Sequence, residues 1–390
     1  MRGSRGIAAV LAAFALVACT SSSTVSPPTS GSSSPTASAT SGSPTPAAPV
    51  AMLANGSPVP TCTGTFSADP AQTVSFVADG FAYALDPDTL DTSCALAVTD
   101  PGPFLWGPLG DRVLLGGLQV AGVSAKAPAL GSTGVQPVAL DWGHPVGIAV
   151  VYAEEGSPTP QKLLLESDST EHFHQMPHGT YLDVAYHPSG LALAYILERD
   201  GVQSIWYSTN EGTDPKRLVF TKEGTTFTDV AFSPDGQDLT YIAQHAEGYP
   251  AYHWIDLSDP STLESGWKGD VGQYVSHFFQ APHGSGIAVD LGKTCEESRA
   301  AVLAGPHAER PLLPGEHRPS SVVGWLDGDT VLVSAGRCGG PIDLFAVSYR
   351  GGDVTPLVAG VDAAASRARA PKAPNSLPKE VELEGGSGVG

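Results

Sequence analysis

Two stretches of this chain share one pattern of hydrophobic and polar positions. Residues 183–196 read DVAYHPSGLALAYI, and residues 229–242 read DVAFSPDGQDLTYI. In both, a short apolar run ends at an aromatic residue, a Pro-x-Gly segment follows, and a second run alternates apolar and polar side chains. Proline presets φ at the second turn position, and glycine tolerates the positive φ that follows. Each stretch therefore predicts a β-hairpin.

The same pattern recurs more weakly along the chain. Its aromatic position falls in turn at Trp106, Trp142, Tyr186, Phe232, Phe279 and Trp325. The separations are 36, 44, 46, 47 and 46 residues. A period of about 45 residues with about four short strands per unit is typical of a β-propeller. A shortened unit also begins near Ser75. We therefore predict an all-β fold, a β-propeller of seven blades, with six or eight blades as open alternatives.

The two clearest copies differ at positions that a common scaffold does not dictate. His187 in the first copy stands against Ser233 in the second, and Ser189 stands against Asp235. The shared proline and glycine shape the turn, and the shared aromatic and aliphatic residues fill the interfaces between sheets. We expect the residues that differ to carry the information about function.

These repeats carry a family resemblance. The sequence FSPDG at residues 232–236, and IWYSTNEGTDPKRL from Ile205, are similar to the WD40-like repeat of TolB-type propellers. The resemblance is clearest across residues 180–260 and covers the propeller only, because no segment before residue 75 looks like the separate N-terminal α/β domain of TolB. It implies a propeller architecture and a tendency to bind proteins.

The N-terminal residues have the pattern of an export signal. Arg2 and Arg5 precede an apolar run over residues 7–17, and the run ends in Leu16-Val17-Ala18-Cys19. This ending resembles the bacterial lipobox, Leu-x-Ala-Cys. The resemblance implies a lipid, diacylglycerol with palmitate, on the thiol of Cys19, and removal of residues 1–18 as a signal peptide. We expect a lipid-anchored protein on the extracytoplasmic face of the cell membrane. An ordinary secretory signal is the alternative.

Composition divides the rest of the chain. Residues 20–60 consist largely of Ser, Thr, Pro, Ala and Gly without one charged side chain, which predicts a disordered tether over residues 19–60. Residues 363–390 lack sustained periodicity and are expected to form a loose tail, which leaves residues 61–362 for the propeller. The formal net charge of −20 argues against nucleic acid as a partner. We expect a monomer.

The remaining cysteines suggest disulfides. Cys62, Cys94, Cys295 and Cys338 form an even set in an exported chain, which allows three pairings. Cys295 and Cys338 follow the aromatic positions of adjacent repeats at similar distances, so both fall near the end of a second strand. Cys62 and Cys94 belong to the first unit, where a crosslink would hold the closure of the ring. The register therefore favours pairing Cys62 with Cys94 and Cys295 with Cys338.

Two clusters of polar side chains contain the residue types that coordinate metal ions. His172, His174 and His178 lie close together, and a His-x-His pair on a strand faces one side. A polar loop that is rich in histidine explains them more simply, so they are weak metal candidates. The run DPDTLD at residues 86–91 has oxygen ligands at alternate positions but lacks the glycine and glutamate of an EF-hand. A hairpin turn explains it better. We predict no metal and no cofactor.

Catalytic signatures do not appear in the sequence. There is no Gly-x-Ser-x-Gly elbow, P-loop or dinucleotide fingerprint, and the serine of HGSG at residues 283–286 falls in a repeat turn. We therefore predict no catalytic residues. The sequence favours a lipid-anchored propeller that serves as a protein-binding or assembly platform with an envelope protein as partner. The alternative is a propeller enzyme or a small-ligand or carbohydrate binder that uses the central channel.

Overall fold

The structure, a computed structural model, describes a defined set of residues. They are residues 50–62, 72–98, 105–106, 112–115, 119–122, 137–143, 147–152, 162–167, 170–172, 177–209, 215–221, 224–261, 263–283 and 285–366. The predicted signal peptide, the lipidated Cys19 and most of the predicted tether and tail lie outside these residues. No helix within the described part of the chain is long and apolar enough to cross a membrane.

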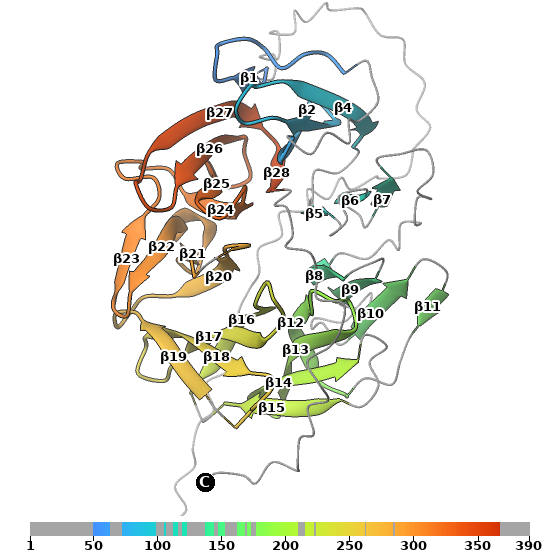
Figure 1. The fold of residues 1–390 in the computed structure, drawn as a ribbon, viewed down its shortest axis with the longest axis vertical. Helices are drawn as coiled ribbons and strands as arrows, with labels where there is room; N and C mark the ends of the chain where they lie inside the picture. Colours follow the sequence, from blue (N-terminus) through green and yellow to red (C-terminus); the bar gives the residue numbers. More distant parts are fainter. Residues whose placement is uncertain are drawn as a thin grey trace, which may run out of the picture. The chain divides into compact units, whose positions relative to one another are not determined.

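The described residues form seven antiparallel sheets, and Figure 1 shows how these succeed one another. The first sheet contains β28 (Ala363–Ser366), β2 (Val74–Ala78), β3 (Phe81–Leu85) and β4 (Thr92–Ala97). The second contains β5 (Leu105–Trp106), β6 (Arg112–Leu115) and β7 (Gln119–Gly122). The third contains β8 (Pro137–Gly143), β9 (Gly147–Tyr152), β10 (Lys162–Ser167) and β11 (Thr170–His172).

The four remaining sheets begin with the two clearest repeats and with the weaker copies at Phe279 and Trp325. They contain β12 (Thr180–Tyr186), β13 (Ala192–Arg199), β14 (Val202–Thr209) and β15 (Lys216–Phe220); β16 (Thr226–Phe232), β17 (Asp238–Gln244), β18 (Pro250–Asp256) and β19 (Leu263–Lys268); β20 (Val275–Gln280), β21 (Ile287–Leu291), β22 (Arg299–Gly305) and β23 (Ala308–Pro311); and β24 (Ser320–Trp325), β25 (Thr330–Gly336), β26 (Ile342–Ser348), β27 (Val354–Val361) and β1 (Met52–Leu53). A short 3-10 turn, η2 (Cys295–Glu297), precedes β22.

Neighbouring sheets contact one another mainly through their first strands. β8 contacts β12, β12 contacts β16, and the series continues through β20, β24, β28 and β5. Every aromatic residue that marked a repeat in the sequence lies on such a first strand. These observations confirm the predicted all-β propeller class. The blade count stays a prediction.

The core lies between the sheets. Ile196 and Ile205 of one sheet, both fully buried, pack with Phe227, Leu239 and Tyr241 of the next. Each sheet therefore buries an apolar face against its neighbour, which is why the sequence repeats apolar positions with the period of a whole sheet.

Both ends of the folded part extend beyond the predicted limits of residues 61–362. β1 falls in the segment predicted as tether, yet it pairs with β27 through Met52 and Ala359. β28 begins at Ala363, in the predicted tail, and pairs with β2. Neither strand could be predicted, because β1 has two residues and β28 reads AAAS, so neither shows an alternating pattern.

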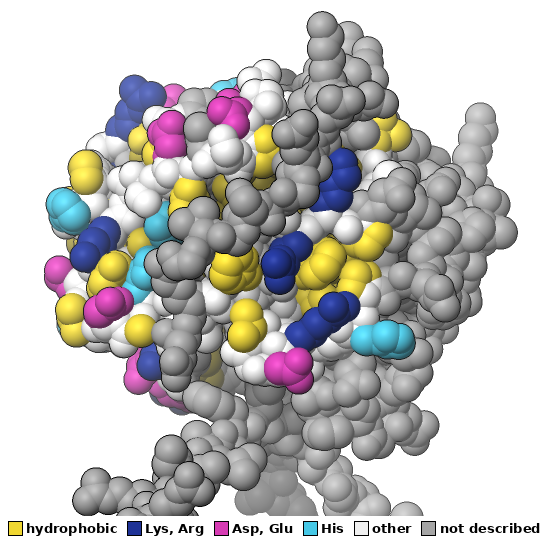
Figure 2. All heavy atoms as spheres, turned by 90° about the horizontal axis from the view of Figure 1, so that it is seen from below, with side chains coloured by type: hydrophobic (Ala, Val, Ile, Leu, Met, Phe, Trp, Pro, Cys, Tyr) yellow, Lys and Arg dark blue, Asp and Glu magenta, His cyan; other side chains and the backbone are white. Residues whose placement is uncertain are grey.

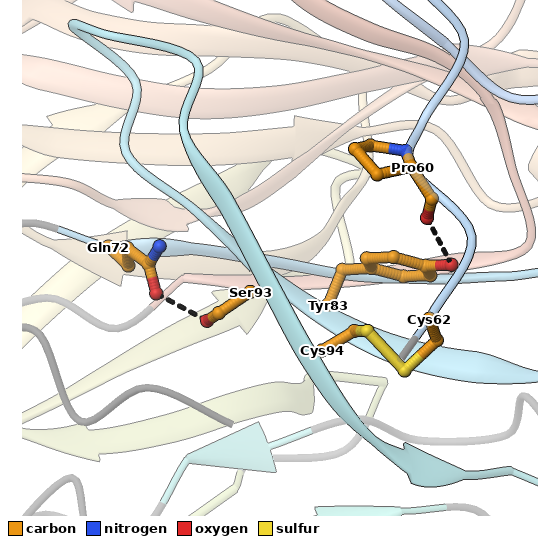
Figure 3. The surroundings of a disulfide bond; sticks show 6 residues. All are labelled: Pro60, Cys62, Gln72, Tyr83, Ser93 and Cys94. Carbon is orange, nitrogen blue, oxygen red and sulfur yellow. Dashed lines mark hydrogen bonds between the residues drawn. A yellow bond between two sulfur atoms is a disulfide. The ribbon is translucent and has the colours of Figure 1, made fainter. Parts of the chain in front are cut away.

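Two disulfides cross-link the fold. Cys295 is joined to Cys338, and the two lie in equivalent loops between the second and third strands of adjacent sheets. Cys62 is joined to Cys94 of β4, with Cα atoms 5.6 Å apart. Figure 3 shows this bond beside Tyr83, whose hydroxyl donates a 3.1 Å hydrogen bond to the carbonyl of Pro60. These pairings are the ones that the repeat register favoured.

Candidate functional site

A groove lies at the seam between the β16–β19 sheet and the β20–β23 sheet. It consists of two adjoining recesses of about 470 and 280 Å³, which share Tyr252, Trp254, Gln280 and Ser285. The larger recess, which we name the outer recess, is also lined by Ser233, Pro234, Asp235, Asp238, Thr240, Pro282 and His283. The smaller, which we name the inner recess, is also lined by Gly266, Trp267, Gly286, Ile287, Leu303 and Gly305. Together they are of the size of small-ligand sites.

Gln280 of β20 bridges the floor of the groove. Its Nε2 atom donates hydrogen bonds to Oγ1 of Thr240 at 2.6 Å and to the hydroxyl of Tyr252 at 3.2 Å. Tyr252 and Trp254 alternate along β18 and so face the same side, with ring centroids 6.0 Å apart. Tyr252 is buried, whereas Trp254 is half-buried. The groove therefore has a fixed polar floor and an aromatic wall.

The preceding seam, between the β12–β15 and β16–β19 sheets, is closed by two rings at the matching position. His187 packs edge-on against Phe232 with ring centroids 5.2 Å apart. Its Nε2–H donates to the carbonyl of Gly236 at 2.9 Å, while Nδ1 accepts the backbone N–H of Ser189. Burial lowers the pKa of His187, so the neutral ring is favoured.

Strand register explains why the next seam is open. Tyr186 pairs with Leu193, Phe232 pairs with Leu239, and Gln280 pairs with Ile287. Ser233 is therefore the equivalent of His187, and Gln280 is the equivalent of Phe232. Both rings that fill one seam are replaced by smaller polar side chains in the other. The sequence prediction that Phe279 occupies the repeated aromatic position was wrong by one residue.

Acidic side chains surround the outer recess. Asp235 is exposed and accepts a 2.7 Å hydrogen bond from the hydroxyl of Ser233. Partial burial, and then the negative charges of Asp235 and Asp256, raise the pKa of Asp238. Neither recess has a lysine or arginine among its described lining residues. The field in the groove therefore disfavours anions.

A separate set of carboxylates ties the sheets together. Asp183 accepts the backbone N–H of Val230 at 2.9 Å, and Asp229 accepts that of Phe278 at 2.8 Å. Burial raises the pKa of Asp183 to about 6, and burial together with the nearby charge of Asp183 raises that of Asp229. In each case a first-strand aspartate bonds the first strand of the next sheet, which is a structural role.

The histidine cluster from the sequence is only partly described. His172 is the last residue of β11, but its side chain lies outside the described residues, as does all of His174. His178 is exposed, and its backbone carbonyl accepts a hydrogen bond from Arg199. No group of three metal-ligating side chains occurs within the described part of the chain.

The aspartate run at residues 86–91 forms the turn between β3 and β4. Asp86 Oδ1 accepts the backbone N–H of Asp88 at 2.8 Å, and the carbonyl of Asp86 accepts that of Leu90 at 2.9 Å.

His283 of the HGSG segment lines the groove, so the turn at residues 283–286 belongs to the candidate site.

Sequence reasoning named Ser233 and Asp235 as informative positions but missed Tyr252, Trp254 and Gln280. The alternation of aromatic residues in AYHWID, residues 251–256, was a signal for a shared aromatic face. Nothing in the sequence indicated that the face lies at an open seam, because that depends on which residues occupy the two first strands.

Cationic side chains gather instead on the β12–β15 sheet. Figure 2 looks at the molecule from the side of β15 and β19 and shows Lys and Arg among hydrophobic side chains. Arg217 stacks over Phe220 at 5.0 Å, and Arg199 stacks over Trp206 at 5.6 Å. The arginine side chains at this surface are positively charged, whereas the charged side chains that line the outer recess are acidic.

Comparisons with known proteins bear on the fold. No family model matches the chain, and no curated protein matches it. Among solved structures, it is similar to a chain from a structural and mechanistic analysis of two prolyl endopeptidases, with 13% identity, 80% of this chain and 50% of that chain covered, and a TM-score of 0.55. This chain thus spans about half the length of that protein.

Two further solved structures are similar over comparable lengths. TolB from Acinetobacter baumannii has 14% identity, with 78% of this chain and 67% of that chain covered and a TM-score of 0.43. An oligogalacturonate lyase in complex with manganese has 14% identity, with 77% and 88% covered and a TM-score of 0.48. At these identities, the similarity to the endopeptidase chain concerns the fold alone.

Proposed function

We propose that this chain is an exported, lipid-anchored β-propeller that binds a component of the cell envelope, with the groove as its binding site. The observation that carries this proposal is the replacement of His187 and Phe232 by Ser233 and Gln280 at one seam. The occupants of these two positions vary, since the seam that follows the groove has Ala281 and Trp325 there. Among the seams described from β12 to β24, only the groove seam has polar side chains at both positions, and ligand binding is a reason for that.

Export and anchoring are supported by two observations. Leu16-Val17-Ala18-Cys19 has the pattern of a lipidation site, and the folded part contains two disulfides, which persist in oxidising compartments. A lipid on Cys19 would hold the propeller on the extracytoplasmic face of the membrane through the segment that precedes β1.

The groove bears on the two functions raised by the sequence. A protein-binding platform needs a broad surface, whereas two recesses of about 470 and 280 Å³ specifically favour the second candidate, a small-ligand or carbohydrate binder. The position between two sheets differs from the central channel expected. No serine or threonine hydroxyl among the described lining residues is hydrogen-bonded to a histidine. We therefore propose the groove as a binding site.

Two measurements on intact cells test this proposal. Radiolabelled palmitate should label the protein but not the Cys19→Ala variant, and that variant should leave the membrane fraction. A photo-crosslinking amino acid in place of the exposed Ser285 should capture an envelope component, whereas one in place of exposed Val202, on another sheet, should not. Equal capture from both positions would contradict the assignment of the groove.

A further inference from the structure

The groove combines flat aromatic faces, hydrogen-bond acceptors and the absence of described cationic side chains. From this combination we infer that its ligand is a neutral glycan, bound as a short run of sugar rings. The inference rests on the proposed function and names the ligand class for the same site. Two sets of contacts, and the poorer fit of other ligand classes, support it.

The aromatic wall is built for stacking. The Tyr252 and Trp254 rings lie at 39° to each other, and Trp254 remains half-buried. A Cβ atom at Gly266 would lie 2.6 Å from Cζ3 of Trp254, so only glycine lets the neighbouring strand pack this closely against the indole. The orientation of Trp254 is therefore fixed before a ligand arrives. The C–H face of a sugar ring is apolar and flat enough to cover it.

The polar groups of the groove require a ligand that both donates and accepts hydrogen bonds. Asp235, Asp238 and the free Oε1 atom of Gln280 are acceptors, since Nε2 of Gln280 already donates within the floor. The hydroxyl of Ser285, which is exposed and lines both recesses, is a donor that a ligand can reach. The indole N–H of Trp267 has no partner but is fully buried. A sugar hydroxyl does both, so one class of ligand satisfies the whole set.

Other ligand classes fit less well. An anionic ligand would meet Asp235 and Asp238 and no described lysine or arginine in the lining. A purely apolar ligand would leave the acidic rim without donors. A cationic peptide would suit the two aspartates and Trp254, and its backbone carbonyls are acceptors, but its extended side chains cover the indole face less completely than a flat sugar ring does. The cationic peptide is therefore the competing outcome of the test.

A larger side chain at Gly305 is expected to block the inner recess. A Cβ atom there would meet no heavy atom within 4 Å, so a larger side chain can enter the inner recess without displacing its neighbours. Gly305→Leu should fill that recess, and Trp254→Ala should remove the stacking face. Phe220→Ser is the matched control, because Phe220 is 44% exposed on the outer edge of another sheet.

The experiment is calorimetric titration of the purified full-length chain in mild detergent with cellohexaose, hexa-N-acetylchitohexaose, maltohexaose, mannohexaose and a decalysine peptide. At least one hexasaccharide should bind, with a Kd that changes less than about twofold between about 50 and 300 mM salt, since a neutral ligand is not screened. Trp254→Ala and Gly305→Leu should each weaken binding about tenfold or more, and Phe220→Ser should not. Circular dichroism and urea denaturation check that the variants fold.

Three results would overturn the glycan assignment. They are the absence of binding to all four saccharides, binding that both groove variants leave unchanged, and binding of decalysine alone that is lost at high salt. The proposed function fails separately. If palmitate does not label Cys19, or if the crosslinker at Ser285 captures nothing, anchoring or groove binding is wrong whatever the saccharides do in vitro. Capture of a protein at Ser285 without saccharide binding would keep the groove and reject the glycan.

Discussion

The Nε2 atom of His187 lies 2.9 Å from the carbonyl oxygen of Gly236, and this hydrogen bond joins two neighbouring sheets. A Cβ atom at Gly236 would lie 2.3 Å from the same Nε2, so the ring occupies the place where a side chain of the next sheet would stand. The positive φ of 73° at Gly236 also favours glycine there. The His187 ring therefore closes this seam, and we call it the plug. At the next seam Ser233 stands in its place, and the groove remains open there.

The first prediction concerns this plug. His187→Ala removes a ring that is 1% exposed and leaves the Gly236 carbonyl without its donor, so the free energy of unfolding should fall by about 2–4 kcal/mol. Urea denaturation measures this. Ser233→Ala, at the equivalent position, loses a hydroxyl but no ring and should cost only about 1 kcal/mol. Equal losses for the two variants would refute the role of the His187 ring in closing its seam.

The second prediction is that the groove can be closed by copying its neighbour. The double variant Ser233→His, Gln280→Phe places at the open seam the two rings that pack at the closed one. It should abolish ligand capture at the groove while the free energy of unfolding stays within about 1 kcal/mol of the parent or rises. Crosslinking and urea denaturation on the same preparation test both parts, and retained capture would show that the ligand binds elsewhere.

The third prediction is an unusual pH dependence. Asp290 is 5% exposed, accepts the backbone N–H of Val322 at 2.7 Å, and has a pKa that burial raises to about 7. The folded state holds a proton that the unfolded chain releases at about pH 4, so this contribution to stability is full below about pH 4 and is lost as the pH rises to about 7.

Asp290→Asn keeps the acceptor and removes the charge. The variant should therefore be more stable than the parent by about 1–3 kcal/mol at pH 8, and the difference should vanish near pH 4. Thermal unfolding at a series of pH values measures it. A constant difference across that range would mean that Asp290 does not titrate in the folded state.

The fourth prediction concerns the disulfide between Cys295 and Cys338. It joins equivalent loops of adjacent sheets across 43 residues, so it restricts the unfolded chain. Replacing both cysteines by serine should lower the free energy of unfolding by about 2–4 kcal/mol. Treating the parent with a reducing agent is the control and should shift its unfolding in the same direction, with no further shift in the variant unless the Cys62–Cys94 bond contributes.

The sequence was sufficient for the scaffold because the scaffold repeats. Phe232 and Trp325 marked first strands correctly, since each is the last residue of its strand and precedes a turn. Phe279 misled because the next residue, Gln280, holds the structural position, and a polar residue in an aromatic place is invisible to a search for aromatics. The groove was missed for the same reason. β1 was missed because two residues carry no period.

The pairing of β1 with β27 has a mechanical consequence. Any pull on the chain from its N-terminal side reaches the folded part first at Met52 and Leu53, which are held to the β27 edge by a very short ladder. Such a ladder yields before a full-length strand does. The bond between Cys62 and Cys94 then stops the peeling, because force passes through it into β4. The fold thus has a weakly paired N-terminal strand followed by a covalent crosslink. This order would let a protein held from its N-terminal side resist a pulling force without unfolding the sheets that form the groove.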